Sequence, residues 1–196
     1  MHDRDIVRRA DDSVVQMLED GPLFFRRSRG YAPMPVVLPG SEGRDGPEVL
    51  AVGPELKNTV CVLKEDRAFL SPHIGDLEGR PSMEAFERNV ECLRTIYEID
   101  CPTLARDLHP DYLSTRFADE AAAAGRGRDP VAIQHHFAHV VSCMVDNELD
   151  GDVLGVSWDG TGLGPDGTLW GGEFLHATQT AFERWREENA PGTGPD

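Results

Sequence analysis

The sequence predicts an α/β fold built on a mixed sheet. Short β-type runs follow residue 48, and two helical patterns alternate with further strand-like runs between residues 82 and 134. Alternation of strands with helices is typical of α/β domains. The first three strand-like runs follow one another without a helix between them. They indicate an antiparallel meander, and therefore a sheet that is not purely parallel.

The amino-acid composition is typical of a globular protein and argues against nucleic-acid and membrane partners. The 196 residues are 39% apolar, which is enough for a core, and 35 acidic against 19 basic residues give a net charge of −16. This charge opposes binding to a nucleic-acid backbone. No apolar run reaches the length of a membrane span, and the N-terminus lacks the apolar core of a signal peptide. We therefore expect a cytoplasmic protein whose partners are neither nucleic acids nor membranes.

The four cysteines show no C-x-x-C spacing, and each lies in or beside an apolar run. This pattern predicts free thiols in a reducing compartment. The cysteines are Cys61, Cys92, Cys101 and Cys143.

The N-terminal part divides into two segments. Residues 1–31 do not resemble the start of a domain, and residues 32–48 hold four prolines and three glycines, which predicts a linker. The meander then begins at Val49, with strand-like runs over 49–56, 58–66 and 68–75. Gly53, Lys57 and Asn58 are expected at the turn of its first hairpin.

The middle of the chain alternates helix and strand. Apolar residues at three- and four-residue steps predict an amphipathic helix from Ser82, its expected N-cap, to Tyr97. A short strand is expected over 101–108. Ser114 is expected to cap an alanine-rich helix that stops at Gly125, and residues 131–134 return to strand.

The C-terminal part of the sequence predicts a β-hairpin followed by an irregular tail. The run TLWGGEFLHA predicts a β-hairpin over 168–177. Residues 181–196 are charged and rich in glycine and proline, which predicts an irregular tail. We expect the chain to be a fragment at both ends.

A pair of histidines is the first candidate site. His135 and His139 stand four residues apart, so on a helix they share one face at a separation suited to a single metal ion. Ser142 and Asp146 continue that face, and His136 points away as a supporting or structural residue. The apolar residues of the opposite face are Phe137, Val140, Val141, Met144 and Val145.

Asp159 is the expected third ligand, because it ends the strand-like run VLGVSWD and a strand end delivers a carboxylate into a cleft. A set of two histidines and one carboxylate suits zinc or ferrous iron. A second interpretation stays open, in which Asp159 and Gly160 form an Asp-Gly turn.

A glycine-rich loop is the second candidate site. Residues 162–167 match G-x-G-x-x-G, but Pro165 and Asp166 lie inside the match and a strand follows it, which excludes a dinucleotide fold. Two interpretations remain: a loop whose amides and Thr161 hydroxyl approach phosphate, or a hairpin turn that needs glycine. The spacing of acidic residues does not fit a calcium loop, and protease, α/β-hydrolase and P-loop motifs are absent from the sequence.

Six segments in one order resemble the HypF family, the carbamoyltransferases of [NiFe]-hydrogenase maturation. The resemblance covers the chain from about residue 11 to residue 175. The segments are RRSRGYAP, LAVGPELKNT, LSPHIGDLE, DLHPDY, QHHFAH and DGTGLGPDGTLWGGEFL.

The resemblance implies a domain plan. Residues 1–31 would end a YrdC-like domain, 32–48 would be a linker, and 49–180 would form the first lobe of a TsaD-like domain. That lobe belongs to the actin-like ATPase, sugar kinase and Hsp70 (ribonuclease H-like) superfamily. Residues 181–196 would be a truncated tail.

The resemblance also implies a function. Family members convert carbamoyl phosphate and ATP into a carbamoyl adenylate and pass the carbamoyl group to a C-terminal cysteine of HypE, as precursor of the cyanide ligands. An H-x-x-x-H motif in related domains binds metal near the nucleotide, and it falls here on His135 and His139, with Asp159 as a further ligand and the fourth in a second lobe. The isolated chain is expected to be inactive.

The remaining site residues follow from the same resemblance. Lys57 and Asn58 are expected to hold carbamoyl or phosphate oxygens, whereas Thr161 and the amides of the glycine-rich loop face the nucleotide phosphates. The loop residues are Gly160, Gly162 and Gly164. Two alternatives stay open: a TsaD-like or O-carbamoyltransferase lobe with another acceptor, and a metal-binding interaction module without turnover.

Overall fold

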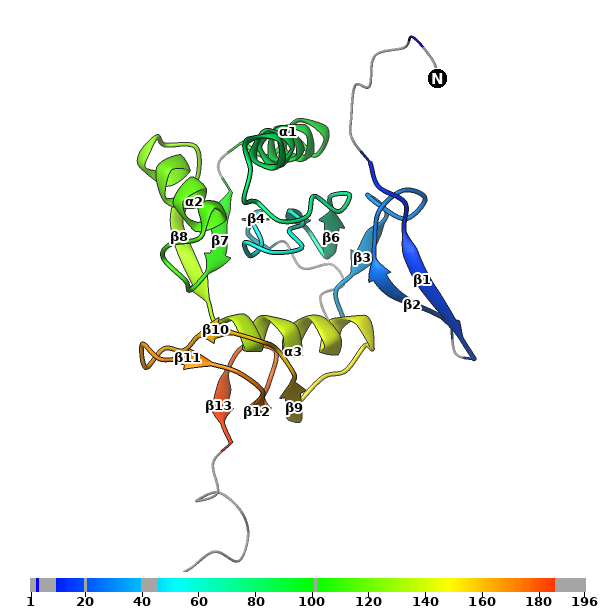
Figure 1. Cartoon of the computed structure of the whole chain (residues 1–196), viewed down its shortest axis with the longest axis vertical. Coiled ribbons are helices and arrows are strands. Elements are labelled where there is room, and N and C mark those ends of the chain that lie inside the picture. The colour runs from blue at the N-terminus through cyan, green and yellow to red at the C-terminus, as the bar shows by residue number, and fades with distance from the viewer. Residues whose placement is uncertain (1–2, 4–9, 20, 40–45, 101, 186–196) are drawn as a thin grey trace, which may run out of the picture.

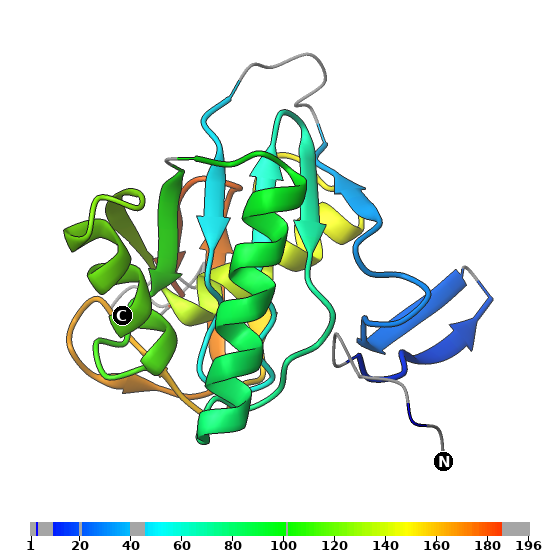
Figure 2. The same ribbon diagram turned by 90° about the horizontal axis from the view of Figure 1, so that it is seen from above.

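The computed structural model describes residue 3 and residues 10–19, 21–39, 46–100 and 102–185. In this part of the chain, helices α1 and α2 cover one face of a six-stranded sheet, and helix α3 lies on the opposite side (Figures 1 and 2). A three-stranded sheet lies beyond α3 (Figure 1). The fold is therefore α/β, as predicted, with the two candidate histidines on the helix between two sheets.

The larger sheet has the strand order β3-β6-β5-β4-β7-β8. Neighbouring strands from β3 to β4 are antiparallel, whereas β4, β7 and β8 are parallel. The predicted meander and the mixed sheet are both confirmed. The strands are β3 Pro35–Val37, β4 Val49–Ala51, β5 Cys61–Lys64, β6 Arg67–Leu70, β7 Thr103–Asp107 and β8 Arg128–Ile133.

The main core lies between this sheet and its two helices. Leu50 of β4 and Leu104 of β7 belong to the same buried cluster as Phe86 of α1, which is itself fully buried. The rings of Phe86 and Phe117 of α2 meet edge to face, with centroids 4.9 Å apart. Burial of these side chains supplies the dominant favourable term for this layer. The helices are α1 Arg80–Ile96 and α2 Leu113–Ala123.

The predicted N-cap of α1 is wrong. The helix begins two residues before Ser82, with Gly79 as its N-cap and Pro81 in the first turn. Proline is favoured there because its missing N–H has no partner inside the helix at that position. A serine N-cap was therefore not needed to start the helix.

The predicted N-cap of α2 is also wrong. Tyr112 occupies the cap position and makes no side-chain cap bond, while Ser114 lies buried within the first turn. A remote carboxylate takes the place of a local cap, because Glu55 Oε2 accepts a 2.7 Å hydrogen bond from the backbone N–H of Leu113. Such a contact is invisible to local sequence patterns. The predicted stop is confirmed, since Gly125 follows the helix with a φ of +70°.

The smaller sheet packs against α3, which spans His135–Asp146. Its strands are antiparallel in the order β13-β12-β9, and β10 and β11 form a separate hairpin. Val140 and Met144 are buried from the predicted apolar face, and Phe137 stacks on Phe182 of β13. The strands are β9 Val153–Ser157, β10 Gly162–Leu163, β11 Leu169–Trp170, β12 Glu173–Ala177 and β13 Phe182–Arg184.

Two expectations for this region are wrong. The run 168–177 is not one hairpin, because β11 pairs with β10 and β12 pairs with β9 and β13. The segment expected to be an irregular tail contributes strand β13, and residues 186–196 lie outside the described residues. The span 49–180, expected to be one lobe, is thus distributed over two sheets with α3 between them (Figure 1).

The N-terminal segments also contain strands. β1, Val14–Leu18, and β2, Gly21–Arg26, form an antiparallel hairpin. Within the predicted linker, β3 pairs with β6 at the edge of the large sheet, which corrects the expectation of a structureless connection. Pro35 is tolerated there because an edge strand need not donate on its outer side. The YrdC-like origin of residues 1–31 stays a prediction.

Two further expectations concern location and thiols. The described part of the chain contains no helix that is long and apolar enough to cross a membrane. Cys61 and Cys143 are free thiols, while Cys101 lies outside the described residues. The cytoplasmic location stays a prediction.

Candidate metal centre

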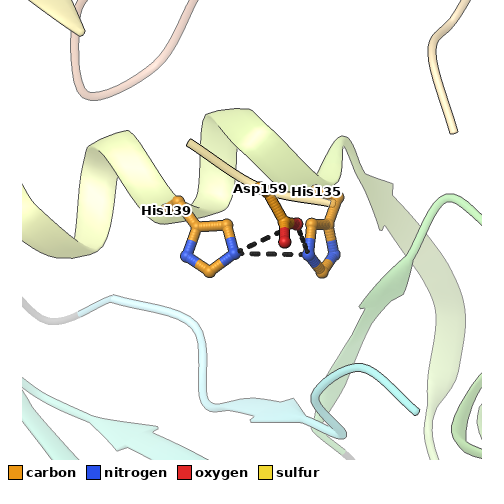
Figure 3. A group of neighbouring side chains, drawn as sticks. All are labelled: His135, His139 and Asp159. Carbon is orange, nitrogen blue, oxygen red and sulfur yellow. Dashed lines mark hydrogen bonds and ion pairs between the residues drawn. The ribbon is translucent and has the colours of Figure 1, made fainter. Parts of the chain in front are cut away.

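The first two turns of α3 carry the two histidines. The chain leaves β8 at Ile133, and Gln134 then caps the helix, because its Oε1 accepts a 2.8 Å hydrogen bond from Phe137 N–H. Starting the helix at His135 places His139 one turn later on the same face. Both rings are turned toward Asp159, which follows β9 (Figure 3).

Three donor atoms converge at this point. His135 Nε2 lies 2.8 Å from Asp159 Oδ2, and His139 Nε2 lies 3.7 Å from the same oxygen. The two Nε2 atoms are 3.2 Å apart. Asp159 Oδ2 is buried and makes no hydrogen bond of ordinary geometry with the described residues. Three ligand atoms within 4.8 Å of one another, one of them an unsatisfied carboxylate oxygen, fit a divalent cation.

The two histidines have different electrostatic environments. The hydrogen bond from the imidazole to Asp107 is the largest effect on His135 and raises its pKa, with the charges of Asp107 and Asp159 adding to this and burial opposing it. Burial lowers the pKa of His139, and the charge of His135 lowers it further. Without metal, these shifts favour protonation of His135 over protonation of His139, and the neutral form of His139 is the one that binds metal.

Asp107 is a site residue that the sequence did not predict. It ends β7, its side chain is 5% exposed, and its Oδ2 lies 2.7 Å from His135 Nδ1. The segment DLHPDY is recognisable in the sequence, yet it contains no signal that pairs its first residue with a histidine 28 positions away.

His136 is buried, which fits the structural one of its two predicted roles. Its side chain is fully buried, and its Nδ1 lies 3.0 Å from Gln134 Nε2. It packs against the β10–β11 hairpin, because a Cβ placed on Gly162 would lie 2.6 Å from the His136 ring. Glycine at this position therefore lets the hairpin approach the start of α3.

The glycine-rich loop is a hairpin turn, which settles the two interpretations of residues 162–167. Gly160 N–H donates to Asp159 Oδ1 and Gly164 N–H donates to Thr168 O, so neither amide is available to phosphate. Gly162 and Gly164 are buried, the latter against Trp170. The amides of Gly160 and Gly164 therefore do not form the expected cradle, and Gly160 and Thr161 are the exposed residues of this set.

The ELKNT turn contains two candidate site residues, Lys57 and Asn58, and the structure contradicts the expected role of Asn58. Asn58 is fully buried, and its amide nitrogen donates to Val52 O at 2.8 Å and Pro54 O at 2.7 Å. Both amide donors are thus used to brace the loop, which contradicts a role in binding substrate oxygens. Lys57 is exposed, with its backbone N–H bonded to Asp76 Oδ1 and a φ of 50°. No hydrogen bond or ion pair joins its ammonium to the described residues, and its role in binding carbamoyl or phosphate oxygens stays a prediction.

Comparison with known families matches both layers of the structure. The HypF Kae1-like domain matches residues 44–146, which contain most of the large sheet and α3. The second subdomain of the carbamoyltransferase Kae1-like domain matches residues 155–190, which contain most of the small sheet. The candidate centre therefore joins His135 and His139 from the first match to Asp159 from the second.

Curated relatives carry the same family name. The chain is 44% identical to carbamoyltransferase HypF of Synechocystis sp. over 94% of its length, and 46% identical to carbamoyltransferase HypF of Rhizobium leguminosarum bv. viciae over 93%. It spans only 23% of the length of each of these two relatives.

Solved structures agree with the fold. A full-length HypF, described as in the phosphate- and nucleotide-bound form, matches 94% of this chain and 28% of its own length, with a TM-score of 0.84 and 38% identity. HypF of T. kodakarensis matches 86% of this chain with a TM-score of 0.75. These likenesses confirm the predicted fold superfamily, and with a family model covering more than half of the residues, the chain belongs to the HypF family.

Proposed function

We propose that His135, His139 and Asp159 bind one divalent metal ion, zinc or ferrous iron. The observation that carries this proposal is the convergence of two imidazole Nε2 atoms on a buried carboxylate oxygen that makes no hydrogen bond of ordinary geometry within the described part of the chain. A mixed histidine and carboxylate set suits both metals and leaves coordination positions for a substrate oxygen or a further ligand. The prediction that the fourth ligand comes from a second lobe is part of this proposal.

The metal centre would serve carbamoyl transfer of the HypF type. In this proposal, the whole protein uses carbamoyl phosphate and ATP to form a carbamoyl adenylate and passes the carbamoyl group to a HypE-type acceptor in the cytoplasm. A bound divalent ion would polarise a carbonyl or neutralise phosphate charge. The names of the curated relatives and the nucleotide-bound state of a related HypF support this assignment.

The chain's own residues would contribute positioning and charge. Lys57 is exposed and is proposed to pair with a carbamoyl or phosphate oxygen, and the exposed Thr161 is proposed to contact the nucleotide phosphates. Asp159 and Thr161 are two residues apart, so nucleotide phosphates near Thr161 would also lie near the metal. The isolated chain is expected to show no turnover.

Metal content tests the proposal most simply. The purified chain should retain about one zinc or iron ion, a stoichiometry expected from a single set of ligands. His135→Ala and His139→Ala should lose the ion, while His176→Ala should keep it, because His176 lies exposed beside Asp152 in the small sheet. A wild-type chain that binds no metal, or a double histidine variant that binds it unchanged, would contradict the proposal.

The role of Lys57 is tested separately in a full-length HypF that carries this segment. Lys57→Ala should lower carbamoyl transfer while leaving metal content intact. Lys64→Ala is a matched control, since the Lys64 ammonium is engaged by the Tyr97 carbonyl and Glu48. Unchanged transfer in Lys57→Ala would remove Lys57 from the proposal without affecting the metal centre.

A further inference from the structure

Asp107 is brought to the metal helix by the pairing of two parallel strands. The register of β7 and β8 sets Asp107 opposite Ile133, and Leu108 N–H donates to Ile133 O at 2.9 Å. Parallel strands end at the same edge of a sheet, so the residue that ends β7 meets the residues that follow β8. His135 follows Ile133 by two positions, which places its ring beside the Asp107 carboxylate.

Both oxygens of this carboxylate are engaged. Oδ1 accepts a 2.8 Å hydrogen bond from His109 N–H, and Oδ2 lies 2.7 Å from His135 Nδ1. The loop that follows is itself ordered by packing, because the rings of His109 and Tyr112 stack with centroids 4.4 Å apart. The carboxylate therefore has one orientation, in which Oδ2 faces the imidazole.

Two carboxylates face the His135 ring, Asp107 at Nδ1 and Asp159 at Nε2. An ionised carboxylate only accepts hydrogen bonds, so the Asp107 contact favours the tautomer with hydrogen on Nδ1, whereas the Asp159 contact favours hydrogen on Nε2. A metal ion bound between Nε2 and Asp159 removes this competition, and the Asp107 contact then holds the hydrogen on Nδ1 and leaves the Nε2 lone pair for the ion. Carboxylates that hold the outer nitrogen of a metal-binding histidine recur in metal sites and typically contribute 10–100-fold to affinity.

We propose that Asp107 is a positioning residue for the metal centre, which directs the Nε2 lone pair of His135 toward the ion and links the large sheet to the ligand set. This inference rests on the proposed metal site and extends it by one residue. Asp107 does not contact the ion. It acts through His135, so its removal weakens metal binding without removing a ligand.

The substitution Asp107→Asn separates this role from simple packing. Asparagine is close in size, but it offers one acceptor oxygen and one NH₂ donor. If its oxygen keeps the bond from His109 N–H, its NH₂ group faces His135 Nδ1. The opposite tautomer is then favoured, with hydrogen on Nε2, where metal must bind.

The experiment compares zinc affinity in wild type, Asp107→Asn and a control, Asp111→Asn, by competition with a chelator of known affinity. Asp111 belongs to the same loop but is exposed and pairs with Arg116. Asp107→Asn should weaken zinc binding by about 10–100-fold, and Asp111→Asn should not change it. Equal affinity in wild type and a folded Asp107→Asn would overturn the proposal.

A second measurement detects the tautomer of His135 directly. Asp159 Oδ2 is a competing acceptor 2.8 Å from Nε2, so nitrogen NMR is recorded on metal-free Asp159→Ala at alkaline pH, where His135 should have a protonated Nδ1 and an unprotonated Nε2. The reverse tautomer would overturn the proposed role even if zinc binds to wild type. If the tautomer is as expected but zinc does not bind to wild type, the metal proposal fails while the positioning of His135 by Asp107 stands.

Discussion

The contact between Gly155 of β9 and Val140 of α3 yields the sharpest prediction about how the centre is held together. A Cβ on Gly155 would lie 2.5 and 2.6 Å from the two γ-carbons of Val140. Ordinary carbon–carbon contacts are about 3.5–4.0 Å, so Gly155→Ala forces an overlap of about 1 Å with each methyl group. Val140 is buried and β-branched, and a helix leaves it essentially one rotamer, so the strand and helix must separate.

Gly155→Ala should therefore lower the free energy of unfolding by about 1–3 kcal/mol, the usual range for overpacking. Val140→Ala alone should cost about 2 kcal/mol through lost methyl burial and a cavity. In the double variant the new methyl occupies the vacated space, so the two losses should fall short of additive by about 1–3 kcal/mol.

Urea denaturation of the four chains measures this cycle, with unchanged slopes as the check that only stability differs. Because β9 leads into Asp159, the single variant Gly155→Ala should also weaken zinc binding, and the double variant should recover part of it. Additive losses, or a Gly155→Ala chain as stable as wild type, would refute the packing of β9 on α3.

Three further predictions concern protons, thiols and the ELKNT turn. The raised pKa of His135 stabilises the metal-free fold below the unfolded value of about 6.5, and this stability is lost as pH rises through the folded value. Zinc competes with the proton on His135, so the rise in melting temperature on adding zinc should be larger at pH 8 than at pH 6. A rise that does not depend on pH would contradict this. Burial raises the pKa of Cys61 to about 11, so the rate of its alkylation by iodoacetamide should keep rising well above pH 9. A rate that reaches a plateau below pH 9 would contradict this. Cys143, which is exposed, serves as the comparison. Asn58→Ala should lower the free energy of unfolding by about 1–3 kcal/mol, because two loop carbonyls lose their donor. The affinity of the chain for zinc should be unaffected. Unchanged stability would show that the Asn58 side chain does not stabilise the loop.

Local features of the site could be predicted because they follow from helix periodicity. The spacing of His135 and His139 is enough to place both rings on one face, and the strand-like run before Asp159 is enough to place a carboxylate at a strand end. The separation of His136 from the pair follows from the same periodicity. These assignments required no knowledge of tertiary contacts.

Features that depend on strand pairing could not be predicted. Asp107 meets His135 only because β7 and β8 pair in parallel, and β12 pairs with β9 rather than with the adjacent β11. The cap of α2 likewise comes from Glu55, 58 residues away. Each of these contacts joins distant segments, and local propensity contains no information on which segments will meet.

The glycine-rich loop shows that the residue types of a loop do not reveal which atoms its backbone will contact. Glycines in residues 160–164 indicated amides open to phosphate, yet the structure uses Gly160 and Gly164 N–H groups internally and packs Gly162 on His136. Glycine marks both close ligand approach and close packing of the chain on itself. The two uses of glycine are distinguished only by the atoms that contact it, and the tertiary fold determines which atoms these are.

The central claim is that His135, His139 and Asp159 share one metal ion. Anomalous diffraction from crystals of the wild-type chain grown with zinc tests it most directly. The peak should lie about 2.0–2.2 Å from both Nε2 atoms and from an oxygen of Asp159. A peak coordinated by other residues, or none at this position with zinc in excess, would contradict the claim.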